Sequence, residues 1–170
     1  MKKICETERL TVRTMTIDDA PFFHALVTDP CYLRIIGDSG VRTLEQARAS
    51  LTERVLVPQA ELGYSRYLVQ LHDGTAIGSC GLVRRPTLDG PDLGYAYLPA
   101  YWGRGYAVEA ARAIVEHAQR DIGMTRLLGI TSPDNTASIG VLTKLGFRFE
   151  RFTYLDAADT GTNVYSRDLT

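Results

Sequence analysis

Cysteine is scarce in this chain, and its few copies are not arranged for a metal site or a disulfide framework. The 170 residues contain three cysteines, Cys5, Cys31 and Cys80, at wide spacing and without a Cys-x-x-Cys pair. An odd, scattered set excludes the disulfide scaffolds of small secreted domains and the ligand spacing of a zinc site. Cys80 lies in an apolar segment, where a small buried hydrophobe is its ordinary role. We therefore expect no bound metal.

Long apolar runs are also missing, and neither sign of charge is in excess. No stretch approaches the roughly 20 apolar residues that cross a bilayer. Lys2 and Lys3 are not followed by the apolar segment of a signal peptide. The net charge is −1, so no overall field favours nucleic acid or a membrane surface. We expect a cytoplasmic protein that binds neither.

The composition that remains is that of an ordinary globular protein. Hydrophobic residues make up 45% and charged residues 23% of the chain, both usual proportions. The length suffices for a sizeable core and is typical of one domain. No repeat, low-complexity stretch or linker divides the chain, so residues 1–170 are interpreted as a single domain.

The most informative segment runs from Pro91 to Ala110 and indicates a strand, a tight loop and a helix. Residues 93–98 are aromatic and aliphatic, which favours a strand, and Pro99 ends it because proline cannot donate to a ladder. Two glycines follow in the loop. From Tyr106 onward apolar residues recur with helical spacing.

A glycine-bearing loop that opens into a helix predicts an anion site. The first backbone N–H groups of a helix lack intrahelical partners, and the macrodipole adds positive charge there. Gly103 and Gly105 let a phosphate approach the backbone, and Arg104 could add a side-chain contact. The loop lacks the Gly-Lys-Ser/Thr of a P-loop, and Val108 stands where a dinucleotide fingerprint has its third glycine. An ordinary strand-to-helix turn is the alternative.

The segment Trp102-Gly-Arg-Gly-Tyr-Ala107 resembles the acyl-CoA pyrophosphate loop of the GNAT superfamily of N-acetyltransferases. That pattern is Gln/Arg-x-x-Gly-x-Gly/Ala. Trp102 in place of Gln/Arg is typical of the branch similar to ribosomal-protein alanine and serine N-acetyltransferases (RimJ/RimL-like). The resemblance extends over nearly the whole chain through three further matches, Thr7 to Arg13, Asn135-Thr-Ala-Ser138 and Lys144-Leu-Gly-Phe147.

The periodicities predict an α/β fold with the element order β-α-α-β-β-β-α-β-α-β-β. The resemblance implies the GNAT-like fold: a mixed, mostly antiparallel sheet of about seven strands flanked by about four helices. It also implies a V-shaped splay between the strand ending at Leu98 and the next strand. The expected strands cover residues 10–13, 64–71, 75–83, 93–98, 126–131, 147–155 and 163–169, and the expected helices begin near residues 20, 43, 106 and 135.

Capping signals mark the first two helices. Thr16 to Asp19 approximates a capping box, and Thr43 to Gln46 is a full one. We expect the first helix to end at Asp29-Pro30 and the second to close at Pro58 and Gly63.

Between these helices, residues 32–40 are expected to be irregular. In acetyltransferases of this kind such a segment often borders the acceptor site, which would involve Tyr32, Arg34 and Asp38. A solvated surface loop is the alternative.

The resemblance implies a set of acetyl-CoA contacts. Backbone N–H groups of the loop would hold the pyrophosphate, and the pantetheine arm would pair with backbone groups of Tyr97 and Leu98. A backbone N–H near Leu98 would polarise the thioester carbonyl. Asn135 would contact CoA, although a helix cap is an equally good interpretation. Arg112 is a further candidate for a CoA phosphate. The cofactor-binding residues that the resemblance implies are Tyr97, Leu98, Trp102, Gly103, Arg104, Gly105, Tyr106, Ala107, Asn135, Ser138 and Lys144.

The catalytic assignments follow from one departure from the family. Many GNAT enzymes place a leaving-group tyrosine seven residues after the asparagine, and here that residue is Leu142. Ser138 is the expected substitute, stabilising the thiolate by hydrogen bonding, and an ordinary first-turn serine is the alternative. Asp92 is the candidate general base, or else a solvated turn residue. His24 and His72 are isolated, and a surface or satisfied histidine is the expected role of each.

The resulting hypothesis is acetyl transfer from acetyl-CoA to a primary amine, by direct attack in a ternary complex. The acceptor could be a protein N-terminus or a small molecule, and the protein a monomer or a homodimer. Two alternatives stay open: a non-catalytic acyl-CoA-binding sensor and a nicotinamide or flavin oxidoreductase.

Overall fold

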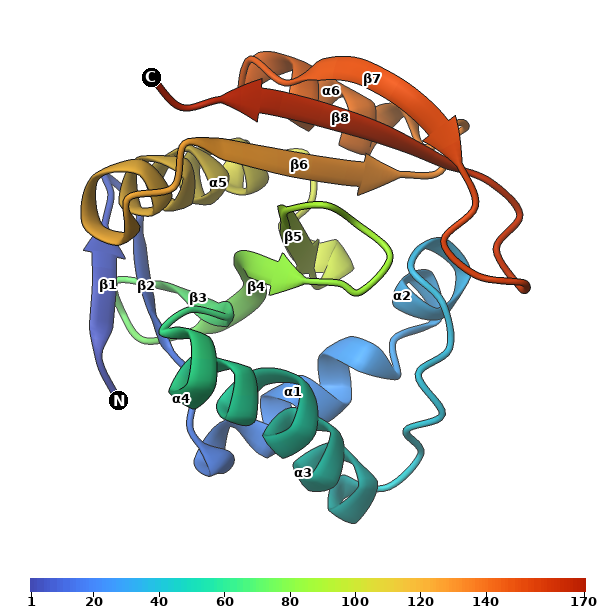
Figure 1. Cartoon of the computed structure of the whole chain (residues 1–170). Helices are drawn as coiled ribbons and strands as arrows, with labels where there is room; N and C mark the ends of the chain where they lie inside the picture. Colours follow the sequence, from blue (N-terminus) through green and yellow to red (C-terminus); the bar gives the residue numbers. More distant parts are fainter.

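Eight strands form one mixed sheet in the computed structural model, which describes residues 1–170 (Figure 1). The spatial order is β1-β2-β3-β4-β5-β6-β8-β7. Neighbouring strands are antiparallel except β5 and β6, which are parallel. The strands are β1 (Lys3–Glu6), β2 (Leu10–Thr14), β3 (Arg66–Leu71), β4 (Ala76–Arg84), β5 (Pro91–Tyr97), β6 (Arg126–Thr131), β7 (Arg148–Thr153) and β8 (Thr162–Asp168).

Helices cover both faces of this sheet. On one face α1 and α3 pack in a cluster that includes Leu68 of β3, and on the other α5 and α6 pack in a larger cluster that includes Tyr67. Adjacent residues of β3 thus point to opposite layers, as the pleat requires. The helices are α1 (Ala20–Val27), α2 (Pro30–Ile35), α3 (Leu44–Leu51), α4 (Val57–Leu62), α5 (Tyr106–His117) and α6 (Thr136–Lys144).

The predicted splay is confirmed. The parallel strands β5 and β6 pair only at Asp92 with Leu128 and Leu93 with Gly129. Beyond these two positions β5 continues to Tyr97 while its edge toward β6 has no strand partner. In Figure 1, β6, β8 and β7 lie together at the top and β4 lies near the centre, with β5 between them. The opening faces the loop that leads into α5.

Three elements differ from the sequence-based expectation. β1 was not predicted, because its pattern is too short and polar to stand out and it is fixed by pairing with β2. Helix α2 occupies part of the segment expected to be irregular. The Asp29 side chain caps it by accepting from the Cys31 N–H, and Pro30 is its first residue. Pro58 does not close the second helix, which continues as α4 to Leu62 after a π-helical turn over residues 52–56.

The predicted caps are otherwise confirmed. The Thr43 hydroxyl accepts from the Gln46 N–H, and the Gln46 side chain accepts from the Thr43 N–H. The Asp19 carboxylate accepts from the Thr16 N–H at 2.8 Å. The π-helical turn that follows α5 ends at Gly123, whose φ is 82°. No helix of the structure has both the length and the apolar character needed to cross a membrane.

Candidate active site

The loop between β5 and α5 presents a run of unused backbone donors. No backbone N–H from Gly103 to Val108 donates a hydrogen bond within the protein; the first helical bond runs from the Glu109 N–H to the Gly105 carbonyl. Gly103 and Gly105 have φ values of 69° and 81°, which only glycine adopts readily. The exposed Arg104 side chain has no acidic partner. The loop is therefore a cradle for an anion at the positive end of α5.

A hydrogen-bond network from the N-terminal segment, made by Thr7 and Arg9, holds this loop in place. The Glu109 carboxylate accepts from the Thr7 hydroxyl at 2.6 Å, the Arg9 N–H at 2.9 Å and the Arg9 Nε at 2.7 Å. Arg9 also donates to the Arg104 carbonyl at 2.9 Å and lies 4.5 Å from the centre of the Tyr106 ring. These bonds lower the pKa of Glu109, although burial opposes the effect. The opening motif thus acts as a brace for a loop about 100 residues away in sequence.

The hydrogen bonds at Leu98 and Trp102 show that the role predicted for the Leu98 backbone is wrong. The Leu98 N–H donates to the Ile77 carbonyl at 3.0 Å, and the Leu98 carbonyl accepts from the Tyr101 N–H at 3.0 Å. Both backbone groups of Leu98 are therefore occupied, so it can neither polarise a thioester nor pair with a pantetheine arm. Trp102 donates its indole N–H to the Tyr97 carbonyl at 2.8 Å, and the residue is 45% exposed. Only the ring remains for ligand contact.

Unused groups of β5 point into the splay instead. Alternate residues of an antiparallel strand direct their backbone groups to the same neighbour. Since Leu98 donates to β4, the N–H groups of Tyr95 and Tyr97 face the opposite side, where β6 has diverged. The backbone donor predicted near Leu98 is thus one of its neighbours, displaced because Leu98 extends the β4 ladder.

Two hydroxyl groups meet beside this edge. The Ser138 Oγ of α6 lies 2.8 Å from the Tyr95 Oη of β5, within hydrogen-bonding distance. Burial raises the pKa of Tyr95 to about 12, so its hydroxyl stays protonated at neutral pH. Asn135 caps α6 by accepting from the Ser138 N–H at 3.1 Å, which leaves its amide NH₂ free. The sequence did not reveal Tyr95, because its approach to Ser138 depends on how α6 packs on the sheet.

Leu142, seven residues after Asn135, is a core residue. It is 1% exposed and packs directly on β6: a Cβ added to Gly129 would lie 2.5 Å from a Leu142 methyl group. The Leu142 side chain has no polar atom, so it cannot donate a hydrogen bond to a leaving thiolate. The hydroxyl groups near the edge of β5 that could do so are those of Ser138 and Tyr95.

Asp92 lies at the start of the splay but does not meet the requirement for a base. Its side chain is 1% exposed, and one oxygen accepts from the Arg85 Nε at 2.8 Å while the other has no partner. Burial raises the pKa of Asp92, and Arg85 offsets part of this rise. A general base must reach the proton that it removes. The predicted base role is therefore not supported by this geometry, and neither is a solvated turn; Asp92 positions Arg85.

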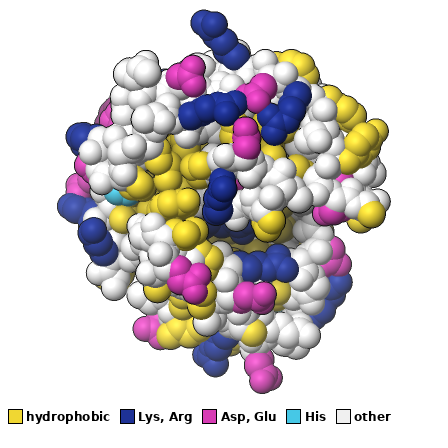
Figure 2. All heavy atoms as spheres, viewed as in Figure 1, with side chains coloured by type: hydrophobic (Ala, Val, Ile, Leu, Met, Phe, Trp, Pro, Cys, Tyr) yellow, Lys and Arg dark blue, Asp and Glu magenta, His cyan; other side chains and the backbone are white.

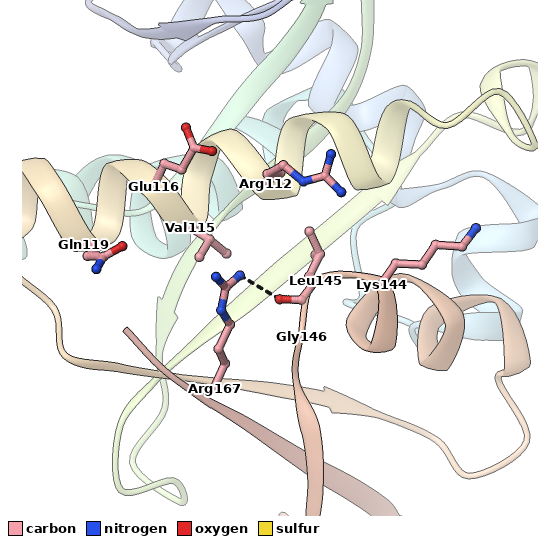
Figure 3. Close-up of a pocket in the computed structure, with 8 residues that line it drawn as sticks. All are labelled: Arg112, Val115, Glu116, Gln119, Lys144, Leu145, Gly146 and Arg167. Atoms are coloured by element: carbon pink, nitrogen blue, oxygen red, sulfur yellow. Dashed lines mark hydrogen bonds between the residues drawn. The ribbon is translucent and has the colours of Figure 1, made fainter. Parts of the chain in front are cut away.

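Lys144 lies apart from the loop, at the far end of α6. It lines a pocket of about 370 Å³ with Arg112, Glu116 and Gln119 of α5 and Arg167 of β8. In Figure 3, Arg112 and Lys144 extend toward the space between the two helices. Arg167 is engaged with the Leu145 carbonyl at 2.6 Å, whereas Arg112 and Lys144 have no ion-pair partner. The pocket is therefore basic and open to a phosphate.

Apart from Tyr32, the remaining sequence candidates are structural or solvated. His24 and His72 each bond a backbone carbonyl, at 3.0 and 3.3 Å. Asp38 forms an exposed ion pair with Arg42, and Arg34 is exposed, whereas Tyr32 packs under α1 and α3. No three His, Cys, Asp or Glu side chains are grouped to hold a metal ion.

The known proteins that are similar to this chain include acetyltransferases. The family model described as Acetyltransferase (GNAT) domain matches residues 9–148. Uncharacterized N-acetyltransferase YoaA of Bacillus subtilis (strain 168) is 27% identical over 173 aligned residues, covering 98% of this chain and 97% of YoaA. The FsC-acetyl coenzyme A-N(2)-transacetylase of Aspergillus fumigatus is 25% identical and covers 91% of this chain and 68% of its own.

Among solved structures, RimL, the ribosomal L7/L12 alpha-N-protein acetyltransferase in complex with coenzyme A, superposes with a TM-score of 0.83. The two chains are 22% identical, and the match covers 99% of this chain and 98% of RimL. At this identity the likeness concerns the fold.

Proposed function

Because the chain belongs to the GNAT acetyltransferase family, we propose that it transfers an acetyl group from acetyl-CoA to a primary amine. The observation that carries the proposal is the run of unused N–H groups from Gly103 to Val108, which ends beside the splay between β5 and β6. Together they form a phosphate cradle next to a gap in the sheet, where the edge of β5 has no strand partner. An extended pantetheine arm fits such a gap, because it can replace the missing strand's hydrogen bonds.

The cofactor would be held by groups at three places. Backbone N–H groups of residues 103–107 and the Arg104 side chain would bind the pyrophosphate, with the Trp102 and Tyr106 rings beside it. The N–H groups of Tyr95 and Tyr97 would face the arm, and the free Asn135 amide would donate to it from α6. Lys144 and Arg112 would attract a further CoA phosphate.

The reaction requires a polarised thioester and a stabilised thiolate. The amine nitrogen attacks the carbonyl carbon, the N–C bond forms, and the C–S bond breaks after a tetrahedral oxyanion. A backbone N–H of Tyr95 or Tyr97 would stabilise that oxyanion, a contribution of about 3 kcal/mol in comparable sites. Ser138, held by Tyr95 at 2.8 Å, would donate a hydrogen bond to the departing sulfur. The amine proton leaves to solvent, since Asp92 is sealed from it.

Thiol release from acetyl-CoA tests the proposal. The protein is incubated with acetyl-CoA and a panel of peptide N-termini, polyamines, amino acids and aminoglycosides, and free thiol is measured. Release that depends on one acceptor class, with the acetylated amine identified by mass spectrometry, is the expected result. A silent panel combined with a higher melting temperature in CoA would support the sensor alternative instead, and no response to CoA would contradict both.

A further inference from the structure

On the sheet face that carries α1 to α4, β5 has few side chains beside the splay. On this face Arg66 of β3 lies opposite Gly81 of β4, which lies opposite Gly94 of β5. The next row runs from Leu68 through Ser79 to Ala96. Gly94 and Ala96 leave the surface of β5 low, and a Cβ added to Gly94 would meet only Val83, at 3.5 Å. On β4 the backbone of Ser65 and Arg66 covers Gly81, where an added Cβ would lie 2.2 Å from the Ser65 carbonyl oxygen. We call this low strip of β5, which lies between the covered β4 and the free edge of β5, the trough.

Arg66 is a cation without a partner on the same sheet face. Its side chain makes no hydrogen bond or ion pair, although the residue is only partly exposed. None of its nitrogens is among the buried atoms that lack a partner, so its donors open onto space that solvent can reach. Burial lowers the pKa of the guanidinium, as expected for a charge held away from bulk water. A half-buried guanidinium with unused donors is costly unless a ligand supplies the acceptors.

The surroundings of Arg66 carry excess positive charge. Asp92 is the one nearby carboxylate, and it is neutralised by Arg85, whose terminal NH groups have no partner. Arg54 and the Tyr32 hydroxyl also lie close enough to Arg66 to affect its pKa. Figure 2 shows Lys and Arg side chains around a hollow near the centre of this face of the molecule. An anion in the trough would complete the charge balance.

We propose that Arg66, with Arg85 and Tyr32 beside it, binds an anionic group of the acceptor, so that the acceptor is a small primary amine that also carries a carboxylate. This inference rests on the proposed acetyl transfer. Strands lie about 4.8 Å apart, so β3 is only about 10 Å from the edge of β5 where the amine would be acetylated. An arginine that reaches across part of this span leaves room for a molecule of amino-acid size. The planar guanidinium suits a carboxylate or a phosphate, whereas the N-terminus of a polypeptide has no such group fixed beside its amine.

Matched acceptors test the inference through thiol-release kinetics. Each amino acid is compared with its neutral amide, and an aminoalkyl phosphate distinguishes a phosphate from a carboxylate. We expect kcat/KM for the acid to exceed that for the amide by at least about 100-fold, because the amide leaves Arg66 unpaired. Arg66→Gln should abolish this preference and leave the KM for acetyl-CoA unchanged, while Arg66→Lys retains part of it. Arg148→Gln, an exposed arginine on the edge strand β7, is the matched control.

The outcomes separate this inference from the proposed function. Turnover of neutral amines at least equal to that of acids would overturn the inference and leave acetyl transfer intact. A preference for the aminoalkyl phosphate would contradict the assignment of a carboxylate as the ligand but would support an anion site at Arg66. If no acceptor reacts, the inference can still be tested by the melting temperature in the presence of CoA and N-acetylglycine. N-acetylglycine is the product that an amino-acid acceptor would give. We expect N-acetylglycine to stabilise the unsubstituted protein and not Arg66→Gln; an equal response of the two would overturn the inference.

Discussion

The hydroxyl pair of Ser138 and Tyr95 is the smallest unit on which the mechanism depends. Removing the Ser138 hydroxyl should lower kcat by about 100-fold, because the thiolate loses its hydrogen-bond donor. The Kd for acetyl-CoA should not change. Tyr95→Phe should have a smaller effect, since this hydroxyl acts through Ser138. Steady-state kinetics and calorimetry measure the two quantities.

Thr143→Ala is the matched control for this experiment. Its hydroxyl also lies on α6, but it is exposed and bonds the Ile139 carbonyl at 2.8 Å. It should leave kcat unchanged. A Ser138→Ala variant that retains full kcat would remove Ser138 from the mechanism and return it to the role of an ordinary helix residue.

Asp92 gives a prediction for stability against pH. Burial raises its pKa above the ordinary value of 3.8, so in the window above 3.8 the folded state holds a proton that the unfolded state has released. The free energy of unfolding therefore falls as the pH rises through this window. Relative to Asp92→Asn, the unsubstituted protein should be more stable at the acidic end than at neutral pH. Urea denaturation at several pH values measures the difference, with the exposed Asp89→Asn as control. The opposite slope would contradict the assignment.

Single residues show where sequence reasoning stops. Asn135 and the glycines of the loop could be placed because a cap and a positive φ are local requirements. Tyr95 and Arg66 could not, because each acquires its role from a neighbour across the sheet or on another layer. The role predicted for the Leu98 backbone was wrong for the same reason. Its N–H donates to the Ile77 carbonyl, and this bond depends on where β4 begins.

The start of α5 depends on backbone conformation more than on side chains. Gly103 has a φ of 69° with open space around its missing Cβ, so Gly103→Ala is strained without a steric clash. We expect a loss of about 1 kcal/mol in the free energy of unfolding and weaker CoA binding. Gly140→Ala is the matched control, because Gly140 lies inside α6 with equally open space. It should gain up to about 1 kcal/mol from helix propensity. Equal effects of the two substitutions would contradict the account of the loop.

The brace between the β1–β2 turn and α5 makes a separate prediction. Arg9→Ala removes the bond to the Arg104 carbonyl and the contact with the Tyr106 ring. The loop should then become less ordered, and the KM for acetyl-CoA should rise about 10-fold, equivalent to about 1.4 kcal/mol, with little change in kcat. Lys3→Ala, which breaks an exposed ion pair with Glu6, should change neither value. A drop in kcat at constant KM would contradict a positioning role.

Elements with strong local signals were predicted well, and elements that depend on pairing were not. The capping boxes, the helix after the glycine loop and the C-terminal hairpin follow from turn chemistry and periodicity. β1 is four residues long, and only its pairing with β2 makes it a strand. The pair Asp29-Pro30 is compatible with the end of one helix and with the start of the next. Asp caps a helix N-terminus, and Pro is tolerated in the first helical turn.

In the whole molecule, the splay connects the two halves of the site. α5 and α6 lie on one sheet face with Ser138 and Tyr95, and Arg66 lies on the other face with the trough. A cofactor in the gap between β5 and β6 would be reached by the acceptor from the opposite layer. The fold could be predicted from the motif order because the resemblance spans the chain. The acceptor side could not, since no motif encodes it.

The central claim is that the N–H groups from Gly103 to Val108 bind the pyrophosphate of CoA. Calorimetric titration with CoA and with pantetheine, which has the same arm but no pyrophosphate, tests it most directly. We expect CoA to bind at least about 100-fold more tightly, equivalent to about 2.7 kcal/mol. Equal affinity of the two ligands, or no binding of CoA, would contradict the account.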